Sequence, residues 1–237
     1  MKFTAVAFDL DGTLYPNFRL FARLLPFILK EHRLLRAFGK TRTILRELHG
    51  NSGNSRASSE KVPFENLQIG DFYETQARIM GEILGQAWEK VRERTERLIY
   101  RGWEPYFRKI RLFPHVRETL DAFRRGGVKM GLLSDFPPET KLKNLNISEY
   151  WDVMISSEQT GSLKPDKKPF LELAALMNKA PEEILYVGNS VPYDIEGAGG
   201  IGMKTAYIRP GWKKFISAVE SDFAFSDYRQ LRDYVLS

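Results

Sequence analysis

The stretch KFTAVAFDLDGTL at residues 2–14 is the part of this sequence that decides the fold. Apolar, β-prone residues run from Lys2 to Phe8 and stop at the acidic turn Asp9-Leu10-Asp11-Gly12-Thr13, which predicts a buried central strand ending in a loop. Ligands of open parallel sheets bind beyond the carboxyl ends of the strands. Two carboxylates at such a place could hold a hard cation, or divide acid and nucleophile between them, although the same residues also form plain turns.

The second half of the chain alternates between strand and helix patterns. A helical stretch from Val116 ends at the glycines at 126 and 127, and further helical stretches cover residues 139–145 and 169–178. Strand patterns cover residues 129–133, 153–155, 184–187 and 205–208. This alternation predicts an α/β fold with a doubly wound, Rossmann-like parallel sheet that is covered on both faces.

Residues 18 to about 110 interrupt this alternation with helical periods and almost no strand signal, so we expect a separate helical insert. Within it we expect a break or kink at Pro26 and a short helix over residues 41–49 that ends at Gly50. A capping box from Asp71 to Glu74 should start one amphipathic helix. That helix should carry apolar residues at positions 80, 83, 87 and 91, and residues 51–59 should form a polar loop.

The composition excludes several classes of protein. Of the 237 residues 43% are hydrophobic and 28% charged, which is ordinary for a soluble globular protein and excludes global disorder. The chain contains 0 cysteines, which excludes disulfides and cysteine nucleophiles and suits a cytoplasmic location. No apolar run approaches the roughly 20 residues of a membrane span, and the first residues lack a secretory signal, so we expect no membrane partner. The net charge of +6 favours anionic partners in general.

Polar side chains follow three further strand patterns. Ser134 follows the strand pattern at 129–133, Lys164 lies between a strand and a helix, and Asn189 with Asp194 follows the strand pattern at 184–187. A hydroxyl, an ammonium group and an amide with a carboxylate are the groups that binding a phosphoryl group and Mg²⁺ requires. Each residue alone has an ordinary structural explanation, such as a cap or a solvated charge.

Together these motifs resemble those of phosphatase-type members of the haloacid dehalogenase superfamily. The first motif is Asp9-Leu10-Asp11-Gly12-Thr13-Leu14, the second is the apolar run ending in Ser134, and the third is Lys164-Pro165. The fourth is Gly188-Asn189-Ser190-Val191-Pro192-Tyr193-Asp194. The resemblance implies a catalytic core formed by residues 1–17 and 113–237, with a helical cap formed by residues 18–112.

The resemblance also implies a Mg²⁺-dependent phosphatase mechanism on a small phosphorylated metabolite. Asp9 would attack phosphorus to form an aspartyl-phosphate, Asp11 would serve as acid and then base, and Lys164 would offset negative charge. The substrate would be bound by Ser134, Asp135 and Thr13. Mg²⁺ would be held by Asp9, by the Asp11 carbonyl, and by Asn189 or Asp194.

The fourth motif departs from the family at Asn189, where the family has an aspartate. An amide oxygen can bind Mg²⁺ but brings no charge, so either the metal affinity falls or Asp194 takes a larger share. Loss of activity is the alternative explanation of this change.

Three other functions remain open. A phosphomutase would keep both aspartates, a non-catalytic interaction protein would keep only the fold, and a nucleic-acid-binding protein would use the basic residues of the cap. We do not expect a nucleic-acid partner, and the sequence leaves monomer and dimer undecided. The three histidines are too scattered for a metal site. The basic residues of the cap either steer an anionic substrate or form a solvated face; they are Arg19, Arg23, Lys30, His32, Arg33, Arg36, Lys40, Arg42 and Arg46.

Overall fold

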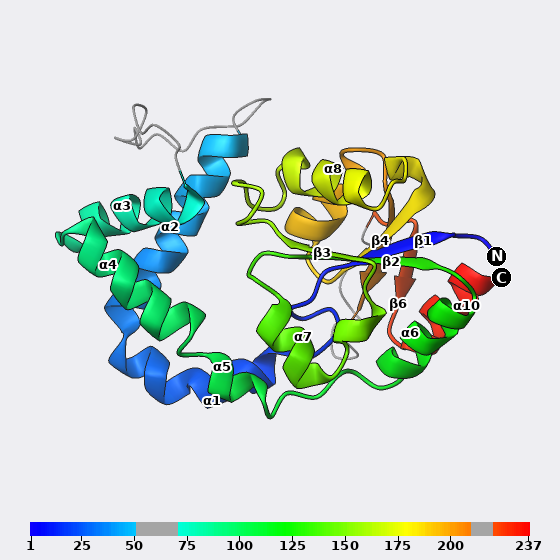
Figure 1. The fold of residues 1–237 in the computed structure, drawn as a ribbon, viewed down its shortest axis with the longest axis horizontal. Helices are drawn as coiled ribbons and strands as arrows, with labels where there is room; N and C mark the ends of the chain where they lie inside the picture. Colours follow the sequence, from blue (N-terminus) through cyan, green and yellow to red (C-terminus); the bar gives the residue numbers. More distant parts are fainter. Residues whose placement is uncertain (51–70, 210–219) are drawn as a thin grey trace.

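A six-stranded parallel sheet forms the core of one of the two parts of the molecule (Figure 1). The computed structural model describes residues 1–50, 71–209 and 220–237. The strand order is β3-β2-β1-β4-β5-β6. The strands are β1 (Ala5–Phe8), β2 (Lys129–Ser134), β3 (Val153–Ser156), β4 (Ile184–Gly188), β5 (Lys204–Ile208) and β6 (Phe223–Phe225).

Strand β1 lies inside the sheet, between β2 and β4, with Phe8 opposite Leu132 on one side and Val187 on the other. Its four residues are all buried, because helices cover both faces of the sheet. Helices α6 (Val116–Arg125), α7 (Glu139–Leu145) and α10 (Tyr228–Leu236) lie on one face. Helices α8 (Lys167–Leu176) and α9 (Glu196–Gly199) lie on the other. The predicted doubly wound α/β fold is therefore confirmed.

Successive side chains of β1 point to opposite faces of the sheet, as in any β-strand. Val6 and Phe8 belong to the large apolar cluster under α6 and α10, whereas Ala5 and Ala7 belong to the cluster under α8. The small alanine side chains leave room for Phe170 of α8, which is fully buried and lies 5.1 Å from the ring of Tyr186. Close packing on both faces holds the carboxyl end of β1 in one position.

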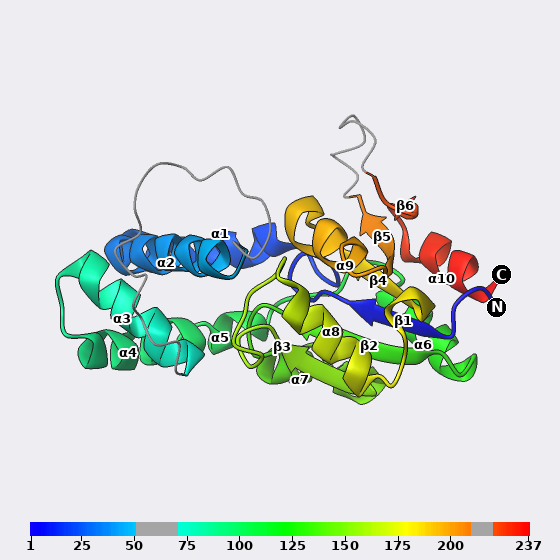
Figure 2. The ribbon, with the colours of Figure 1, turned by 90° about the horizontal axis from the view of Figure 1, so that it is seen from above.

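The insert between β1 and α6 is helical and lies to one side of the sheet (Figures 1 and 2). Its first two helices are α1 (Asn17–Lys30) and α2 (His32–Gly50). They are followed by α3 (Phe72–Leu84), α4 (Trp88–Thr95), the π-helical turn η1 (Glu96–Tyr100) and α5 (Glu104–Phe107). In Figure 2, α1 and α2 form one layer and α3 and α4 lie beneath it. We call these helices the cap.

Two predictions about the first cap helices need correction. The chain does not break at Pro26, since helix α1 continues through this residue and ends at Lys30, and the alternative of a kink there stays a prediction. The loss of one backbone donor at Pro26 is tolerated because Leu20 and Leu24 anchor the preceding turns in the apolar core, with Phe27 and Ile28 packed against it. Residues 41–49 are not a separate short helix either, since they belong to the single helix α2.

The predicted amphipathic helix through residues 80–91 is also divided. Gly85 takes the left-handed conformation, with φ of 63°, and ends α3, so that α4 starts a new helix at Trp88. Met80 and Val91 still pack into one cluster because the two helices fold against each other. Asp71 precedes α3, but its side chain makes no capping hydrogen bond and pairs instead with Arg92 at 3.0 Å. The predicted loop at 51–59 lies outside the described residues.

The remaining helical turns of the core are short and join the elements above. They are η2 (Ser148–Tyr150), η3 (Pro181–Glu183) and η4 (Val191–Ile195). The sequence patterns also missed β6 and α10, which close the sheet beside β5. No helix in the described part of the chain has both the length and the apolar character that a membrane span requires.

We predict that Gly197→Ala destabilises the protein, because α9 packs directly on α8. A Cβ atom at position 197 would lie 2.6 Å from the Phe170 ring and 3.2 Å from Pro165 Cα, so a ring and a backbone atom would have to move. The free energy of unfolding in urea should fall by about 1–3 kcal/mol. Gly199→Ala is the matched control, since its Cβ would meet only Thr205 Cγ2 at 3.8 Å. Equal effects of the two substitutions would contradict this packing.

Candidate active site

The polar residues that follow the strands converge at the carboxyl edge of the sheet. Asp9 follows β1, Ser134 ends β2 and Asn189 follows β4, and these three strands are direct neighbours. The Asp9 backbone N–H donates to Val187 O at 2.9 Å, which continues the sheet pairing to the first aspartate. Parallel pairing thus brings together residues that are more than 100 positions apart in the chain.

Lys164 lies between two carboxylates in the interior of the protein. Its Nζ is 2.7 Å from Asp9 Oδ1 and 2.7 Å from Asp194 Oδ1, and the residue is 3% exposed. Asp9 is 6% exposed and Asp194 is 1% exposed. Burying these three charges is tolerable only because each is paired and hydrogen-bonded.

Burial and neighbouring charges shift the protonation of this group. Burial, together with the nearby Asp194 and Asp11 carboxylates, raises the pKa of Asp9 to about 7 even though Lys164 opposes this change. Burial alone would lower the pKa of Lys164, but Asp194 and Asp9 outweigh it and raise that pKa well above its usual value. Lys164 therefore stays charged, while Asp9 in the protein without metal holds its proton more tightly than a free aspartate.

Thr13 joins Asp9 to Asn189. Its hydroxyl lies 2.7 Å from Asp9 Oδ2 and 3.1 Å from Asn189 Oδ1, both of which are acceptors. One hydroxyl has one proton, so it can satisfy only one of the two oxygens at a time. Because these two oxygen acceptors share a single hydrogen-bond donor, one of them is left without a hydrogen bond. Such a pair of oxygen ligands fits a hard cation such as Mg²⁺.

Gly12 permits this approach of the first and fourth motifs. It has φ of 93°, in the left-handed region that favours glycine, and a Cβ atom there would lie 2.5 Å from Asn189 Nδ2 and 2.7 Å from Asn17 Nδ2. A larger residue would push the Asn189 amide away from the Asp9–Thr13 pair.

Asp194 is engaged differently from Asn189. Its Oδ1 accepts from Lys164, and its Oδ2 accepts from the backbone N–H groups of Asn189 and Ser190 at 3.1 and 3.0 Å. Both oxygens therefore hold the loop after β4 and the buried lysine. Among residues 1–50, 71–209 and 220–237, no three His, Asp or Glu side chains form a group that could hold a metal by themselves, so the Asn189 amide and backbone oxygens matter for any cation here.

The second aspartate of the first motif has two partners that sequence reasoning missed. Lys141 Nζ lies 2.7 Å from Asp11 Oδ1 and 2.5 Å from Oδ2, and the Tyr15 hydroxyl donates to Oδ1. Ser134 Oγ is 3.5 Å from Asp11 Oδ2. Lys141 lies in α7, which also contains Lys143. Nothing in the local sequence distinguishes one lysine from the other, so the sequence alone could not identify Lys141 as a partner of Asp11.

Asp135 makes contacts with the cap. Its carboxylate accepts from Arg46 Nη2 at 2.7 Å and lies 3.4 Å from Arg42 Nη2. Burial would raise the pKa of Asp135, but Arg42, Lys164 and Arg46 together lower it. The Asp135 side chain is thus committed to arginines, and only its backbone remains for a phosphoryl group.

Two members of the predicted basic set turn inward and join α2 to the sheet domain. Arg42 pairs with Glu158 and lies over the Phe136 ring at 4.3 Å, while Arg46 Nε donates to Lys164 O at 2.8 Å. The other basic residues of this set whose side chains the structure describes do not join α2 to the sheet domain. Arg33, Arg36 and Lys40 are exposed, and Arg23 donates to Lys109 O at 3.1 Å. The side chain of Arg19 is outside the described set.

Comparisons with known proteins agree with this geometry. A family model for haloacid dehalogenase-like hydrolases matches residues 3–202. The chain is 28% identical over 242 residues to a phosphoglycolate phosphatase of Salmonella typhi, an alignment that covers 95% of this chain and 90% of the relative.

Two solved structures share the fold over nearly the full length. One is a phosphatase of this superfamily from Thermococcus onnurineus, with TM-score 0.62, 23% identity, and coverage of 99% of this chain and 98% of the other. The second is an L-2-haloacid dehalogenase from Xanthobacter autotrophicus, with TM-score 0.62, 15% identity and coverage of 98% of both chains. At these identities the two structures support the fold alone.

We predict that Asp9→Asn changes how stability depends on pH. The pKa of Asp9 is raised from 3.8 to about 7 in the folded protein, so the folded state keeps its proton where the unfolded chain loses it. As the pH rises from about 4 to 7, the free energy of unfolding of the wild type should therefore fall relative to Asp9→Asn, by on the order of a few kcal/mol. Urea unfolding in EDTA tests this. Asp233→Asn, at an exposed surface carboxylate, is the control, and a pH-independent difference for Asp9→Asn would contradict the assignment.

Proposed function

This chain belongs to the haloacid dehalogenase-like hydrolases and is of their phosphatase type, and from this premise we propose that it hydrolyses a small phosphorylated metabolite through an aspartyl-phosphate intermediate. The observation that carries the proposal is the cluster of Asp9, Asp11 and Lys164 at the carboxyl edge of the sheet, with Lys164 Nζ 2.7 Å from Asp9. A dehalogenase would not need the second aspartate as an acid. We further propose that residues 18–112 form the cap and the rest the catalytic core.

Asp9 is the proposed nucleophile. Its carboxylate oxygen would form a bond to phosphorus while the bond from phosphorus to the leaving oxygen breaks, which gives an acyl phosphate on Asp9 and an alcohol. Lys164 stays charged beside Asp9 and would offset the negative charge that gathers there. Asp194 would act as a positioning residue, because it holds Lys164 and the loop after β4.

Asp11 is the proposed acid and base. A protonated Asp11 would donate to the leaving oxygen, and an ionised Asp11 would then take a proton from the water that hydrolyses the acyl phosphate. Lys141 and Tyr15 contact the carboxylate oxygens of Asp11. These two residues would fix the direction of the carboxylate during both steps.

The phosphoryl group would be bound at the ends of β1 and β2. Ser134 and Thr13 supply hydroxyl groups, and Asp135 would supply its backbone N–H, because its side chain is engaged with Arg46 and Arg42. Mg²⁺ would be held by the Asp9 carboxylate, the Asp11 backbone carbonyl and the Asn189 amide oxygen. When bound, this ion would neutralise phosphoryl charge next to the nucleophile.

The relatives support phosphoglycolate as the first substrate to test, since a phosphoglycolate phosphatase shares 28% identity over 95% of this chain. We also propose a cytoplasmic location, which is supported by the absence of cysteine from all 237 residues.

We predict that Asp9→Asn lowers the rate of phosphate release by about a thousandfold or more, because no neighbouring carboxylate can take its in-line position. Phosphate release from p-nitrophenyl phosphate measures this. Asp233→Asn should retain the wild-type rate, since that residue lies on the surface of α10. Retention of the wild-type rate by Asp9→Asn would refute the assignment of the nucleophile.

We predict that Asn189→Asp lowers the Mg²⁺ concentration needed for half-maximal activity by about tenfold, because a charged oxygen would replace a neutral one beside Asp9. Titration of activity with Mg²⁺ measures this. Asp194→Asn should instead lower the maximum rate, because it disturbs Lys164. A Mg²⁺ requirement that changes in Asp194→Asn and not in Asn189→Asp would show that Asp194 is the ligand.

A further inference from the structure

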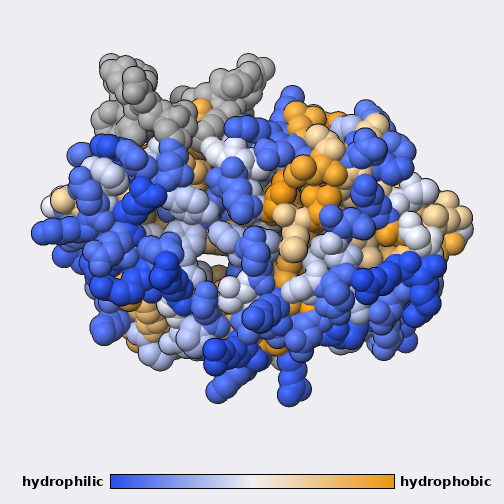
Figure 3. Space-filling model, viewed as in Figure 1, coloured by the Kyte–Doolittle hydropathy of each residue, from blue (hydrophilic) through white to orange (hydrophobic). Residues whose placement is uncertain are grey.

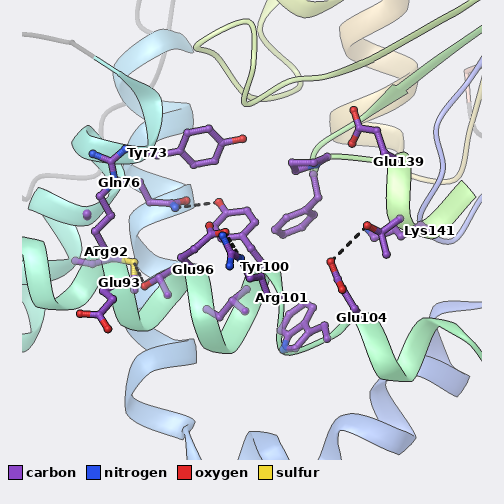
Figure 4. Close-up of a pocket in the computed structure, with 18 of the residues that line it drawn as sticks. Tyr73, Gln76, Arg92, Glu93, Glu96, Tyr100, Arg101, Glu104, Glu139 and Lys141 are labelled. Atoms are coloured by element: carbon purple, nitrogen blue, oxygen red, sulfur yellow. Dashed lines mark hydrogen bonds and ion pairs between the residues drawn. The ribbon is translucent and has the colours of Figure 1, made fainter. Parts of the chain in front are cut away.

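A cavity of about 750 Å³ lies between the cap and the sheet domain (Figure 4). Residues of α3, α4, η1 and α5 form its cap side, and residues 136–141 form its core side. In Figure 3 an opening between the two parts of the molecule marks the same region. The cavity has no role in the chemistry proposed so far.

Two lining residues connect this cavity to the active site. Lys141 touches both carboxylate oxygens of Asp11, the proposed acid. The Phe136 backbone N–H donates to Ser134 Oγ, at 3.2 Å, in the proposed phosphoryl site. The acid that protonates a leaving group must lie on the same side of the phosphoryl group as that leaving group. The cavity is on the side of Asp11, because Lys141 lines the cavity and contacts Asp11.

The cavity is large for a small acid. Cavities of about 300–1,000 Å³ are the usual size for ligands as large as a drug molecule or a nucleoside. A two-carbon leaving group such as glycolate would fill only a small part of it. The volume thus favours a larger leaving group than the one named by the relatives.

The walls of the cavity are aromatic. The Phe136 ring centroid lies 6.2 Å from that of Tyr100 and 6.4 Å from that of Trp103. Such contacts hold the rings in place, and fixed rings offer faces and edges to another flat ring. The aromatic residues of the wall are Tyr73, Trp88, Tyr100, Trp103, Phe107 and Phe136.

The charges of the cavity disfavour an anionic leaving group. Its cations are already paired with carboxylates: Arg92 with Asp71, Arg101 with Glu96, and Lys141 with Asp11. In the described part of the chain, no other Lys or Arg lines it. Five glutamates do so, namely Glu89, Glu93, Glu96, Glu104 and Glu139, of which Glu93 pairs with Arg97 and Glu96 with Arg101. An additional carboxylate here would face like charges without a free cation.

Two polar atoms of the wall lack hydrogen-bond partners in the described structure. Tyr100 donates to Glu158 at 3.0 Å and accepts from Gln76 Nε2 at 3.0 Å. This chain of contacts sets the direction of the Gln76 amide and leaves Gln76 Oε1 without a donor. Trp103 Nε1 likewise lacks an acceptor. Both atoms are buried, so a ligand with polar ring atoms could satisfy them only if their side chains turn toward the cavity.

We propose that this cavity binds the leaving group of the substrate, and that this group is an alcohol that carries a flat, polar heteroaromatic ring and no negative charge. The inference rests on the proposed phosphatase function for its account of turnover. The substrate class is then phosphomonoesters of ring-bearing alcohols, rather than phosphorylated small acids.

Binding of the ring itself is tested without turnover. Trp88 and Trp103 lie in the wall, so tryptophan fluorescence reports on the cavity. Adenosine and pyridoxamine, titrated into the full-length protein, should give saturable quenching, at least with one of them, whereas glycolate should not. Tyr73→Leu, in the wall, should weaken this binding at least fivefold. Tyr106→Leu is the matched control, since Tyr106 is a half-buried cap tyrosine outside the cavity.

Turnover distinguishes this inference from the proposed function. At least one of adenosine 5′-monophosphate and pyridoxamine 5′-phosphate should show kcat/KM at least tenfold above that of phosphoglycolate, and Tyr73→Leu should raise KM for the ring-bearing substrate while phosphoglycolate is unaffected. A preference for phosphoglycolate, with no saturable binding of either ring, would overturn the inference and leave the phosphatase function standing. Ring binding without hydrolysis of these esters or of p-nitrophenyl phosphate would support ring binding in the cavity and refute the phosphatase function.

Discussion

The burial of Lys164 between Asp9 and Asp194 is the constraint on which the rest of the site depends. Lys164 can remain charged in the interior because both carboxylates contact it, and each buried carboxylate is stabilised there by its contact with Lys164. This requirement fixes the loop after β3 against the ends of β1 and β4. The same contacts keep the lysine charged and direct it toward the proposed nucleophile. They therefore both stabilise this edge of the sheet and position the residues that are proposed to carry out the reaction.

The cap is joined to this edge by a second set of buried charges. Arg42 and Arg46, one turn apart on α2, reach Glu158 and Asp135 in the loops after β3 and β2, and Arg46 also bonds the backbone of Lys164. Ion pairs that are shielded from water are costly to leave with one partner missing. The position of α2 is therefore coupled directly to the residues around the proposed phosphoryl site.

The cavity beside Asp11 illustrates why a shared fold does not define a substrate. The four motifs agree with a family that contains phosphatases and dehalogenases, and the two solved relatives differ in the reaction that they are named for. The residues that we propose to select the leaving group lie in the cap and in residues 136–141, where aromatic rings and glutamates line the cavity. Under this proposal, selectivity would follow from ring contacts and charge rather than from the phosphoryl chemistry.

The sequence by itself determined the doubly wound sheet and most of its strands, because strand burial and the polar residues that follow the strands are local patterns that appear in order along the chain. It also identified Asp9, Asp11, Ser134, Lys164 and Asn189 as a group, because parallel pairing brings strand ends to one edge. Only the tertiary structure decided which partners these residues have. Lys141 and Tyr15 on Asp11, Arg42 on Glu158, and the two oxygens of Asp194 that hold Lys164 and the loop after β4 are contacts between distant segments. Their side-chain directions depend on packing across the whole molecule, and no spacing within one segment encodes them. The same holds for the helix that continues through Pro26, since buried leucines on α1 outweigh the local preference of proline.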